Sequence, residues 1–431
     1  MLTRSSGPMK LREWYRRLVR ADLAATGGRV LVIKAAAKAP ARAAREAYDA
    51  VRLYGTRALE THGVSRLQQF ILLWWLNVRH GLLSDSFYSY ELFRPDRRQR
   101  ASRFVQGPEA ARLYRLLAAR RFTREAEILA DKRTFEAWCE ENALPTISIL
   151  AEFEDGRMSG SVVSEPLPAW DLFAKSPVDY GGRGVSRWRH IAPNAYEGEG
   201  RRLSSAELVR ELARRSAAGP LILQRAESNH PSLAGVTAGA LCTLRLLTVR
   251  APDSCPEIVA AAFRMAVGGA AADNYAQGGI ASAVNLDAGT LGPGVRYDGR
   301  GAVRRFTTHP DTGARITGTR LPFWTESVHL VLRAHALLGG IPVVGWDVAL
   351  LANGPLLLEG NWNPGVKTVQ MPSGVPLGDT AYAACLNVHL EATFDVSDAP
   401  GMRAASLWEP QWSSASPGRE CVDRVPVEEL L

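Results

Sequence analysis

The stretch GWDVALLANGPLLLEGNWNPG, residues 345–365, contains two apolar runs joined by a turn, and the second run ends in polar side chains. This pattern predicts an antiparallel hairpin. Successive side chains of a strand alternate between its faces, so Glu359 and Asn361 point to the same side. Together with Asp347 they supply hard oxygen donors of the kind that Mg²⁺ bridging phosphates requires. A hairpin whose polar end is merely solvated explains the same residues.

Whether Asp347 joins the other two depends on the turn. With a two-residue loop at 353–354, Asp347 faces away from Glu359. With a three-residue loop at 353–355, Asp347 lies opposite Asn361 and joins the cluster. We predict the three-residue loop.

A second signal is a lysine that leaves an apolar strand, Lys175, followed by a glycine-rich loop at 180–185. Backbone N–H groups and a point charge suit the oxygens of a polyphosphate. The spacing is not that of a Walker loop, and no GxGxxG follows a strand, so a plain glycine-rich turn also explains it. Lys132 lies at the start of a predicted helix over 132–143.

The net charge of the 431 residues is +8, and all of this excess comes from the N-terminal 60 residues. Residues 1–60 hold 13 Lys/Arg and 5 Asp/Glu, and the remaining 371 residues hold 39 of each. A nucleic-acid binder is disfavoured, because its positive groove would lie in the folded body. For residues 1–60 two interpretations stay open. They contact an acidic membrane surface or guide an anionic substrate, or they form a solvated helical face.

The length of the apolar runs and the spacing of the cysteines argue against a membrane-spanning protein and against a cysteine-ligated metal site. The longest apolar run of the front half, Phe70–Leu76, has seven residues, and a membrane-spanning helix needs about 20. Within it we assign Trp74 and Trp75 to core or interface rather than to a base-stacking platform. The five cysteines show no metal-ligand spacing and predict reduced thiols in a cytoplasmic protein.

The residue pattern of the chain changes from helical to strand-like at about residue 145. Residues 10–130 show helical periodicity with few glycines, and short β-branched or aliphatic runs follow. These runs predict strands at 147–150, 220–223, 241–249, 258–265, 343–351 and 355–358. Further helices are predicted at 132–143, 205–216 and 324–338. The fold class is therefore α+β, with much antiparallel sheet behind a helical N-terminal region.

The order of the motifs resembles the ATP-grasp superfamily. Lys132 and Lys175 come first, then Leu223-Gln-Arg-Ala-Glu227, Thr243-Leu-Arg245 and the Asp-to-Glu-x-Asn set of the hairpin. Within the superfamily the chain is most similar to the sugar-transfer-associated group, which also resembles the α-L-glutamate ligases. The likeness covers roughly residues 120–395.

The resemblance implies two α+β lobes whose antiparallel sheets clamp ATP. We expect a basic helical region at 1–118, an N-terminal lobe at 119–225, a C-terminal lobe at 226–397 and a loose tail at 398–431. One departure from the family is that Ser176 separates Lys175 from Pro177, which alters the loop.

Site residues carried over from the resemblance fall into four groups. ATP is expected to meet Lys132, Lys175, Gly181, Gly182, Gly184, Gln224, Arg225 and Glu227. Arg245 and Asn274 are expected to be catalytic, and His230, Gly278 and Gly279 to face the substrate. The metal ligands for Mg²⁺ are expected to be Asp347, Glu359 and Asn361.

The function implied is that of a Mg-ATP-dependent carboxylate–amine ligase. A substrate carboxylate would form an acyl phosphate, which an amine captures as an amide, in polysaccharide or envelope assembly or in natural-product assembly. The substrate would be a small molecule, a peptide or an amino sugar. Two alternatives stay open, a phosphotransferase on the same fold and a nucleotide-binding scaffold with little catalysis.

Overall fold

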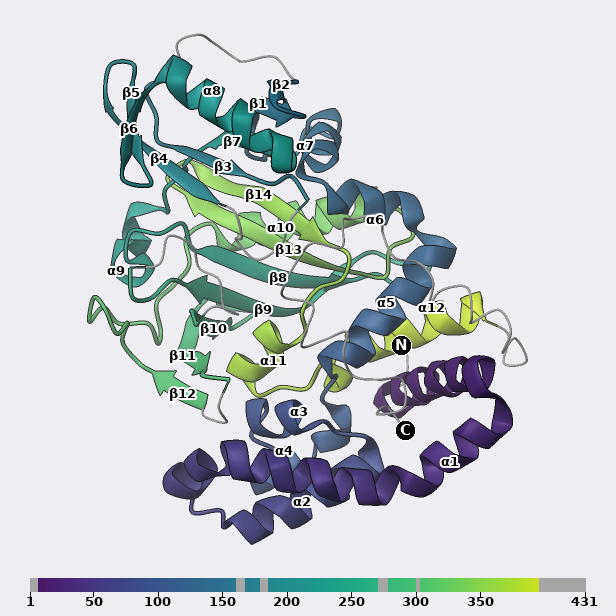
Figure 1. Ribbon diagram of the computed structural model, residues 1–431. Coiled ribbons are helices and arrows are strands. Elements are labelled where there is room, and N and C mark those ends of the chain that lie inside the picture. The colour runs from purple at the N-terminus through teal and green to yellow at the C-terminus, as the bar shows by residue number, and fades with distance from the viewer. Residues whose placement is uncertain (1–6, 160–166, 179–184, 270–277, 300–302, 395–431) are drawn as a thin grey trace.

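The computed structural model describes residues 7–159, 167–178, 185–269, 278–299 and 303–394, and the structural statements below concern those residues. Two sheets lie one above the other, with helices around them and a helical layer at one end (Figure 1). The helices are α1 Gly7–His62, α2 Arg66–His80, α3 Ser84–Ser89, α4 Pro95–Arg98, α5 Gly107–Arg121, α6 Thr123–Ala130, α7 Lys132–Glu141, α8 Ser205–Arg215, α9 Ala234–Thr237, α10 Trp324–Leu337, α11 Lys367–Ser373 and α12 Ala381–Thr393.

The strands divide between the sheets by their position in the chain. The first sheet has the order β2-β1-β7-β3-β4-β5-β6, and the second has the order β12-β11-β10-β9-β8-β13-β14. Their bounds are β1 Ile149–Glu154, β2 Arg157–Met158, β3 Leu172–Lys175, β4 Ser186–Ala192, β5 Ala195–Gly198, β6 Arg201–Ser204, β7 Leu221–Arg225, β8 Thr243–Val249, β9 Glu257–Met265, β10 Ile280–Val284, β11 Leu291–Tyr297, β12 Val303–Phe306, β13 Val343–Leu351 and β14 Gly354–Asn361.

All pairings within both sheets are antiparallel, which confirms the predicted α+β class. The six predicted strands are present as β1, β7, β8, β9, β13 and β14, and the predicted helices are present as α7, α8 and α10. Apolar runs of this kind are long enough to reveal buried strands. Among the strands that the sequence did not reveal, β5 and β6 have four residues each, too few for a clear alternation.

The first sheet has its own hydrophobic core beneath α8. Leu208 and Leu212 of this helix pack with Phe153, Trp188 and Tyr196 of the sheet, and all five are fully buried or nearly so. The helix begins with a capping box, in which Ser204 and Glu207 satisfy each other's backbone N–H groups. The sheet is thereby a unit with one covered face.

The second sheet touches the first through its edge strand β14. Leu357 of β14 donates its backbone N–H to Pro145 O at 2.9 Å, and Thr146 Oγ1 donates to Leu357 O at 2.9 Å. These bonds tie the segment that leads into β1 to the edge of the second sheet, so residues from both sheets meet beside β14. The predicted boundaries near residues 118 and 225 stay predictions, and the tail predicted at 398–431 lies outside the described residues.

The helical region forms a layer against the second sheet, on the side away from the first (Figure 1). Its core, which includes Phe87, Tyr88 and Tyr90, also contains Val295 of β11 and Met371 of α11. The 56-residue helix α1 curves around this end of the molecule. Pro40 lies within it, and an internal proline removes one backbone hydrogen bond and bends a helix.

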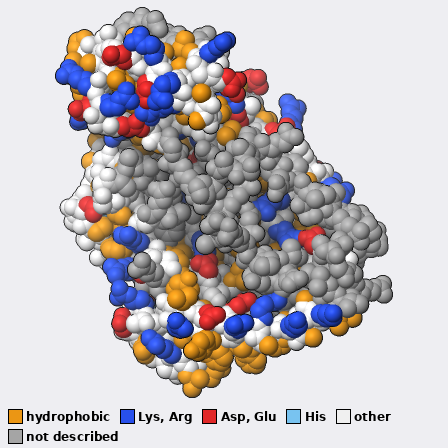
Figure 2. Space-filling model, in the orientation of Figure 1, with side chains coloured by type: hydrophobic (Ala, Val, Ile, Leu, Met, Phe, Trp, Pro, Cys, Tyr) orange, Lys and Arg blue, Asp and Glu red, His pale blue; other side chains and the backbone are white. Residues whose placement is uncertain are grey.

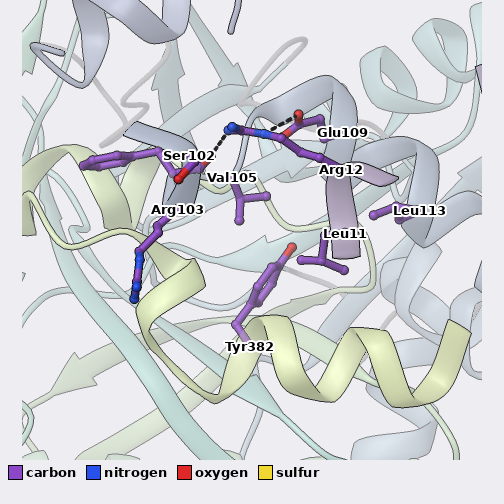
Figure 3. Close-up of a pocket in the computed structure, with 9 residues that line it drawn as sticks. Leu11, Arg12, Ser102, Arg103, Val105, Glu109, Leu113 and Tyr382 are labelled. Carbon is purple, nitrogen blue, oxygen red and sulfur yellow. Dashed lines mark hydrogen bonds and ion pairs between the residues drawn. The ribbon is translucent and has the colours of Figure 1, made fainter. Parts of the chain in front are cut away.

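A small cavity lies where α1 meets α5 and α12 (Figure 3). Its volume of about 10 Å³ leaves room for no more than a water molecule. Arg12 beside it donates Nε to Glu109 Oε1 at 3.0 Å and Nη2 to Phe104 O at 2.6 Å. The hydroxyls of Tyr114 and Tyr382 share a hydrogen bond of 2.5 Å nearby. We therefore regard this region as a helix–helix junction rather than a ligand site.

Two further features concern the helices and the cysteines of the described residues. No helix in the described part of the chain is long and apolar enough to cross a membrane. Four of the five cysteines, Cys139, Cys242, Cys255 and Cys385, lie in the described ranges and are free thiols.

Candidate functional site

Charged side chains form a row across β8, β13 and β14. Arg245 of β8 lies opposite Asp347 of β13, and Asp347 lies opposite Glu359 of β14. Residues directly opposite each other in antiparallel strands project to the same face of the sheet. Asp347 is only 2% exposed in the interior strand, whereas Glu359 lies on the edge strand and is partly exposed.

The length of the hairpin loop alone does not explain why Asp347 lies on this face. The hairpin loop has two residues, 352–353, and this register alone would put Asp347 opposite Leu358. A β-bulge at Leu358 adds one residue to β14 and moves Glu359 opposite Asp347. The predicted three-residue loop is therefore wrong, although Asp347 and Glu359 share a face as predicted.

Both oxygens of Asp347 accept hydrogen bonds from arginines. Arg245 donates Nε to Oδ1 at 2.5 Å and Nη2 to Oδ2 at 2.9 Å, and Arg264 donates Nη2 to Oδ2 at 3.0 Å. Burial raises the pKa of Asp347, but the charges of the two arginines outweigh burial and hold the pKa well below its usual value. The carboxylate is therefore ionised and holds both guanidinium groups in fixed positions.

None of the sequence motifs includes Arg264, which lies near the end of β9. Its Nε donates to Thr243 Oγ1 at 2.9 Å, so it bridges β8 and the Asp347 carboxylate. A signal was present in the sequence, because Arg264 is the one charged residue in the run Ile258–Met265. Its distance to Asp347 depends on the strand order β9-β8-β13, which only the folded sheet supplies.

Two lysines from the side of the first sheet approach Glu359. Lys132 begins α7 and Lys175 ends β3, as the sequence predicts. Lys132 Nζ lies 3.9 Å from Glu359 Oε2, and its backbone N–H donates to Pro177 O at 2.9 Å. Burial and the charge of Lys132 lower the pKa of Lys175 to about 8, and Glu359 offsets part of this effect. The two ammonium groups are thus close enough to repel each other.

We call these six side chains the charged cluster: Lys132, Lys175, Arg245, Arg264, Asp347 and Glu359. Four cations and two carboxylates leave a net charge of 4 − 2 = +2 at the junction of the two sheets. Such a surplus, partly shielded from water, attracts a multiply charged anion.

Three residues expected to meet ATP, Gln224, Arg225 and Glu227, lie at the end of β7 and just beyond it. Gln224 is buried, and its Nε2 donates to Ile147 O at 3.2 Å. Arg225 is exposed, lies 4.8 Å from the ring centre of Trp170, and has Nε 3.6 Å from Glu227 Oε1. The side chain of Gln224 therefore ties β7 to the segment that leads into β1, whereas Arg225 is exposed and pairs with Glu227.

His230 contacts a different set of residues from the charged cluster. Its Nδ1 accepts from the backbone N–H of Ser232 at 3.2 Å, and His230 thereby caps a short 3₁₀ helix at Pro231–Leu233. The same Nδ1 lies 2.8 Å from Ser232 Oγ. Its ring packs edge-on against Phe323 at 5.6 Å. Ser232 and Phe323 also line an open surface cavity of about 360 Å³.

Gly278 and Gly279 lead into β10. Gly278 has φ +99°, and a Cβ there would lie 3.1 Å from Arg296 Nη2, so the turn both favours glycine and leaves little room for a side chain. The predicted Gly181, Gly182, Gly184 and Asn274 lie outside the described residues.

Comparison with known proteins gives one decisive match. The sequence profile of sugar-transfer associated ATP-grasp proteins matches residues 110–383, well over half of the chain. The chain belongs to this family. A search of curated proteins with the sequence of this chain finds no match.

Solved structures of ATP-grasp type are more distant. An N5-carboxyaminoimidazole ribonucleotide synthetase in its ADP complex is 13% identical over 55% of this chain and 46% of its own, with a TM-score of 0.33. L-amino acid ligase from Bacillus licheniformis is 12% identical over 60% and 48%, with a TM-score of 0.32. D-alanine–D-alanine ligase from Bacillus anthracis is 11% identical over 65% and 69%, with a TM-score of 0.33. The chain thus spans about half the length of the first two, and the family assignment rests on the profile alone.

Donor atoms for a divalent cation are present at the end of β14 in this ATP-grasp chain. Asn361 Nδ2 donates to Glu359 Oε1 at 3.2 Å, which leaves the amide oxygen of Asn361 and the second oxygen of Glu359 for other contacts. Asp347 takes three N–H donors from the arginines and also interacts with Glu359, so the two carboxylates lie together on one face. Within the described ranges, no group of three or more His, Cys, Asp and Glu side chains is arranged to hold a metal ion, so the set is two carboxylates and an amide. These oxygens fit Mg²⁺, which prefers few protein ligands and retains water.

Proposed function

We propose that this protein is a Mg-ATP-dependent ligase that joins a carboxylate to an amine. One observation carries the proposal, the approach of Lys132 from α7 and of Lys175 from the first sheet to Glu359 at the edge of the second. A triphosphate between the two sheets would meet both ammonium groups at once. Membership of the ATP-grasp family supports the same location for ATP.

Each cation of the charged cluster has a distinct task in this proposal. Lys132 and Lys175 hold phosphate oxygens as point charges. Arg245 is fixed by two hydrogen bonds to Asp347, so it needs no reorganisation to stabilise the charge that develops on the transferred phosphoryl group. Arg264 holds the second oxygen of Asp347 and keeps that carboxylate in place.

Asp347, Glu359 and Asn361 would hold Mg²⁺, which when bound neutralises phosphate charge. The substrate carboxylate attacks the γ-phosphorus, the bond to the β–γ bridging oxygen breaks, and ADP leaves. An amine then attacks the acyl carbon of the acyl phosphate, and phosphate and a proton leave. Because the family is described as sugar-transfer associated, we place the substrate among the sugar or peptide acids of polysaccharide or envelope assembly, or of natural-product assembly.

The test measures both products of ATP cleavage. The full chain is incubated with Mg-ATP and with amino acids, uronic acids and amino sugars, singly and in pairs. ADP and free phosphate should appear together, and only when a carboxylate and an amine are both present. ADP release with phosphate retained on a single acceptor would instead identify a phosphotransferase, and failure to cleave ATP with any pair would contradict the proposal.

A substitution separates the metal role of Glu359 from a general effect on folding. Glu359→Gln should reduce turnover by about a hundredfold or more, as loss of one electrostatic group in an active site commonly does. Without Mg²⁺, nucleotide binding by this variant should not weaken, because the amide no longer repels phosphate. Glu127→Gln, at an exposed position of α6, is the matched control and should leave both unchanged. Equal turnover in the two variants would remove Glu359 from the site.

A further inference from the structure

Helix α2 carries an apolar face that the rest of the described chain leaves exposed. Its members recur at helical spacing and are Leu67 at 68% exposed, Ile71 at 51%, Trp74 at 36%, Trp75 at 44% and Val78 at 47%. Steps of four, three, one and three residues put them on one side of the helix. The core part of the prediction for Trp74 and Trp75 is therefore wrong. We call these five residues the α2 face.

The opposite side of α2 is anchored, so the helix cannot turn to bury the α2 face. Leu73 and Leu76 are buried in the core of the helical region. Gln69, also fully buried, donates Nε2 to Gly55 O at 2.9 Å and to Val64 O at 2.7 Å, and its Oε1 accepts from Tyr88 Oη at 3.0 Å. A buried amide with three partners fixes the rotation of the helix, because any roll would leave those groups unpaired.

Positive charges outnumber negative ones in the helices that carry and flank the α2 face. Helix α2 contains no acidic residue, and arginines lie at both of its ends, Arg66 and Arg79. The guanidinium of Arg79 lies 5.6 Å from the ring centre of Trp75. Residues 33–80, which hold the second half of α1 and all of α2, contain 8 Lys/Arg and 3 Asp/Glu, a net charge of 8 − 3 = +5. Figure 2 shows hydrophobic side chains gathered along the lower edge of the molecule, where α1 and α2 lie, with Lys and Arg and some Asp and Glu beside them.

We propose that the α2 face lies in the interfacial region of an anionic lipid bilayer. Exposed leucine, isoleucine and valine would be buried at the acyl boundary, tryptophan rings prefer the headgroup level, and the flanking arginines would meet lipid phosphates. A protein partner for an exposed apolar stripe needs no excess of positive charge, whereas an acidic lipid surface does. The contact lies in the plane of the membrane, consistent with the lack of a spanning helix among the described residues.

This location differs from the sequence-based expectation for residues 1–60. The apolar contacts fall on α2, after that segment, and the basic residues of α1 supply part of the charge. The charged cluster lies on α7 and the two sheets, away from α2 (Figure 1), so membrane attachment and nucleotide chemistry can be tested separately.

The experiment is flotation of the full chain with vesicles of phosphatidylcholine alone and with phosphatidylserine added. The wild type should float with the phosphatidylserine vesicles, lose this binding as salt is raised, and remain unbound with phosphatidylcholine alone. The double variant Leu67→Ser with Ile71→Ser should bind at least about tenfold more weakly, because it lacks two aliphatic side chains that the bilayer would bury. A matched control, Leu286→Ser with Leu337→Ser, changes two exposed leucines elsewhere and should bind as the wild type does.

Three outcomes would overturn the proposal. They are no flotation of the wild type with phosphatidylserine vesicles, equal binding by the double variant and the control, and a wild-type dimer in sedimentation that the double variant abolishes. The last would assign the α2 face to contact between two copies of the chain. Unfolding curves of both double variants should match the wild type, since the substituted side chains are exposed in the folded protein.

Discussion

The two carboxylate oxygens of Asp347 link its own strand, β13, to β8 and β9 of the second sheet. Asp347 is 2% exposed there. Arg245 comes from β8 and Arg264 from β9, so one carboxylate balances one buried and one partly buried cation. A buried ion pair costs desolvation to form, but removal of one partner leaves the other charge unbalanced. Here a single change leaves two arginines unbalanced.

Asp347→Asn should therefore lower the free energy of unfolding by about 3 to 5 kcal/mol near neutral pH. Because the folded-state pKa of Asp347 lies below its unfolded value, its contribution is fully present above the unfolded pKa and is lost as pH falls through the folded value. The difference between variant and wild type should stay constant from neutral pH down to about 5 and shrink below about 4.

Urea unfolding at a series of pH values measures this difference. Asp253→Asn is the control, since Asp253 is an exposed turn residue with φ +55°, which asparagine tolerates. A loss of stability that is the same at every pH, or one that the control reproduces, would contradict the ion-pair explanation.

Helix α7 places Lys132 in the charged cluster, and its N-terminus depends on one residue. The Asp131 carboxylate accepts the Arg133 backbone N–H at 2.8 Å and the Arg133 Nη2 at 2.7 Å. A capping aspartate satisfies a backbone donor that has no partner within the helix and favours the positive end of the helix dipole. Local sequence thus determines where α7 begins, and with it the position of Lys132.

Asp131→Ala should lower the free energy of unfolding by about 1 to 2 kcal/mol through loss of the cap, and Asp131→Asn should lose less, because its side-chain oxygen can still accept. Chemical denaturation of the two variants measures this. If the proposed function holds, the alanine variant should also bind ATP more weakly, since Lys132 is no longer held. Equal losses of stability in the two variants would show that the charge, not the cap, matters.

At the scale of the whole molecule, Glu91 joins the helical region to the second sheet. Glu91 is 1% exposed, and its Oε1 accepts a hydrogen bond from Arg305 Nη1 of β12 at 3.1 Å. Arg97 Nη1 lies 3.2 Å from Glu91 Oε2, and His62 Nε2 lies 3.4 Å from Glu91 Oε1. Burial raises the pKa of Glu91, but the arginines overcome it and the pKa lies below its usual value. The carboxylate is therefore charged and is the centre of the junction.

Glu91→Gln should destabilise the docked helical region by about 3 kcal/mol, because it leaves the surrounding arginines without a counter-charge. Limited proteolysis should then cut the segment between α4 and α5 sooner than in the wild type. Asp96→Asn, which removes the more exposed partner of Arg94, should cost no more than about 1 kcal/mol. Cleavage at the same rate in both variants would show that apolar packing alone holds the helical region.

The sequence by itself determined the α+β class, six strands, the positions of Lys132 and Lys175 at the ends of their elements, and the family likeness. Each of these depends on local periodicity or on an ordered set of short motifs, which are properties of neighbouring residues. The tertiary structure alone decided how Asp347 comes to face Glu359, because a bulge at Leu358 sets that register rather than the turn length. It also decided that Arg264 joins the charged cluster and that Trp74 and Trp75 are exposed, since strand order and the packed side of a helix depend on residues far apart in the chain.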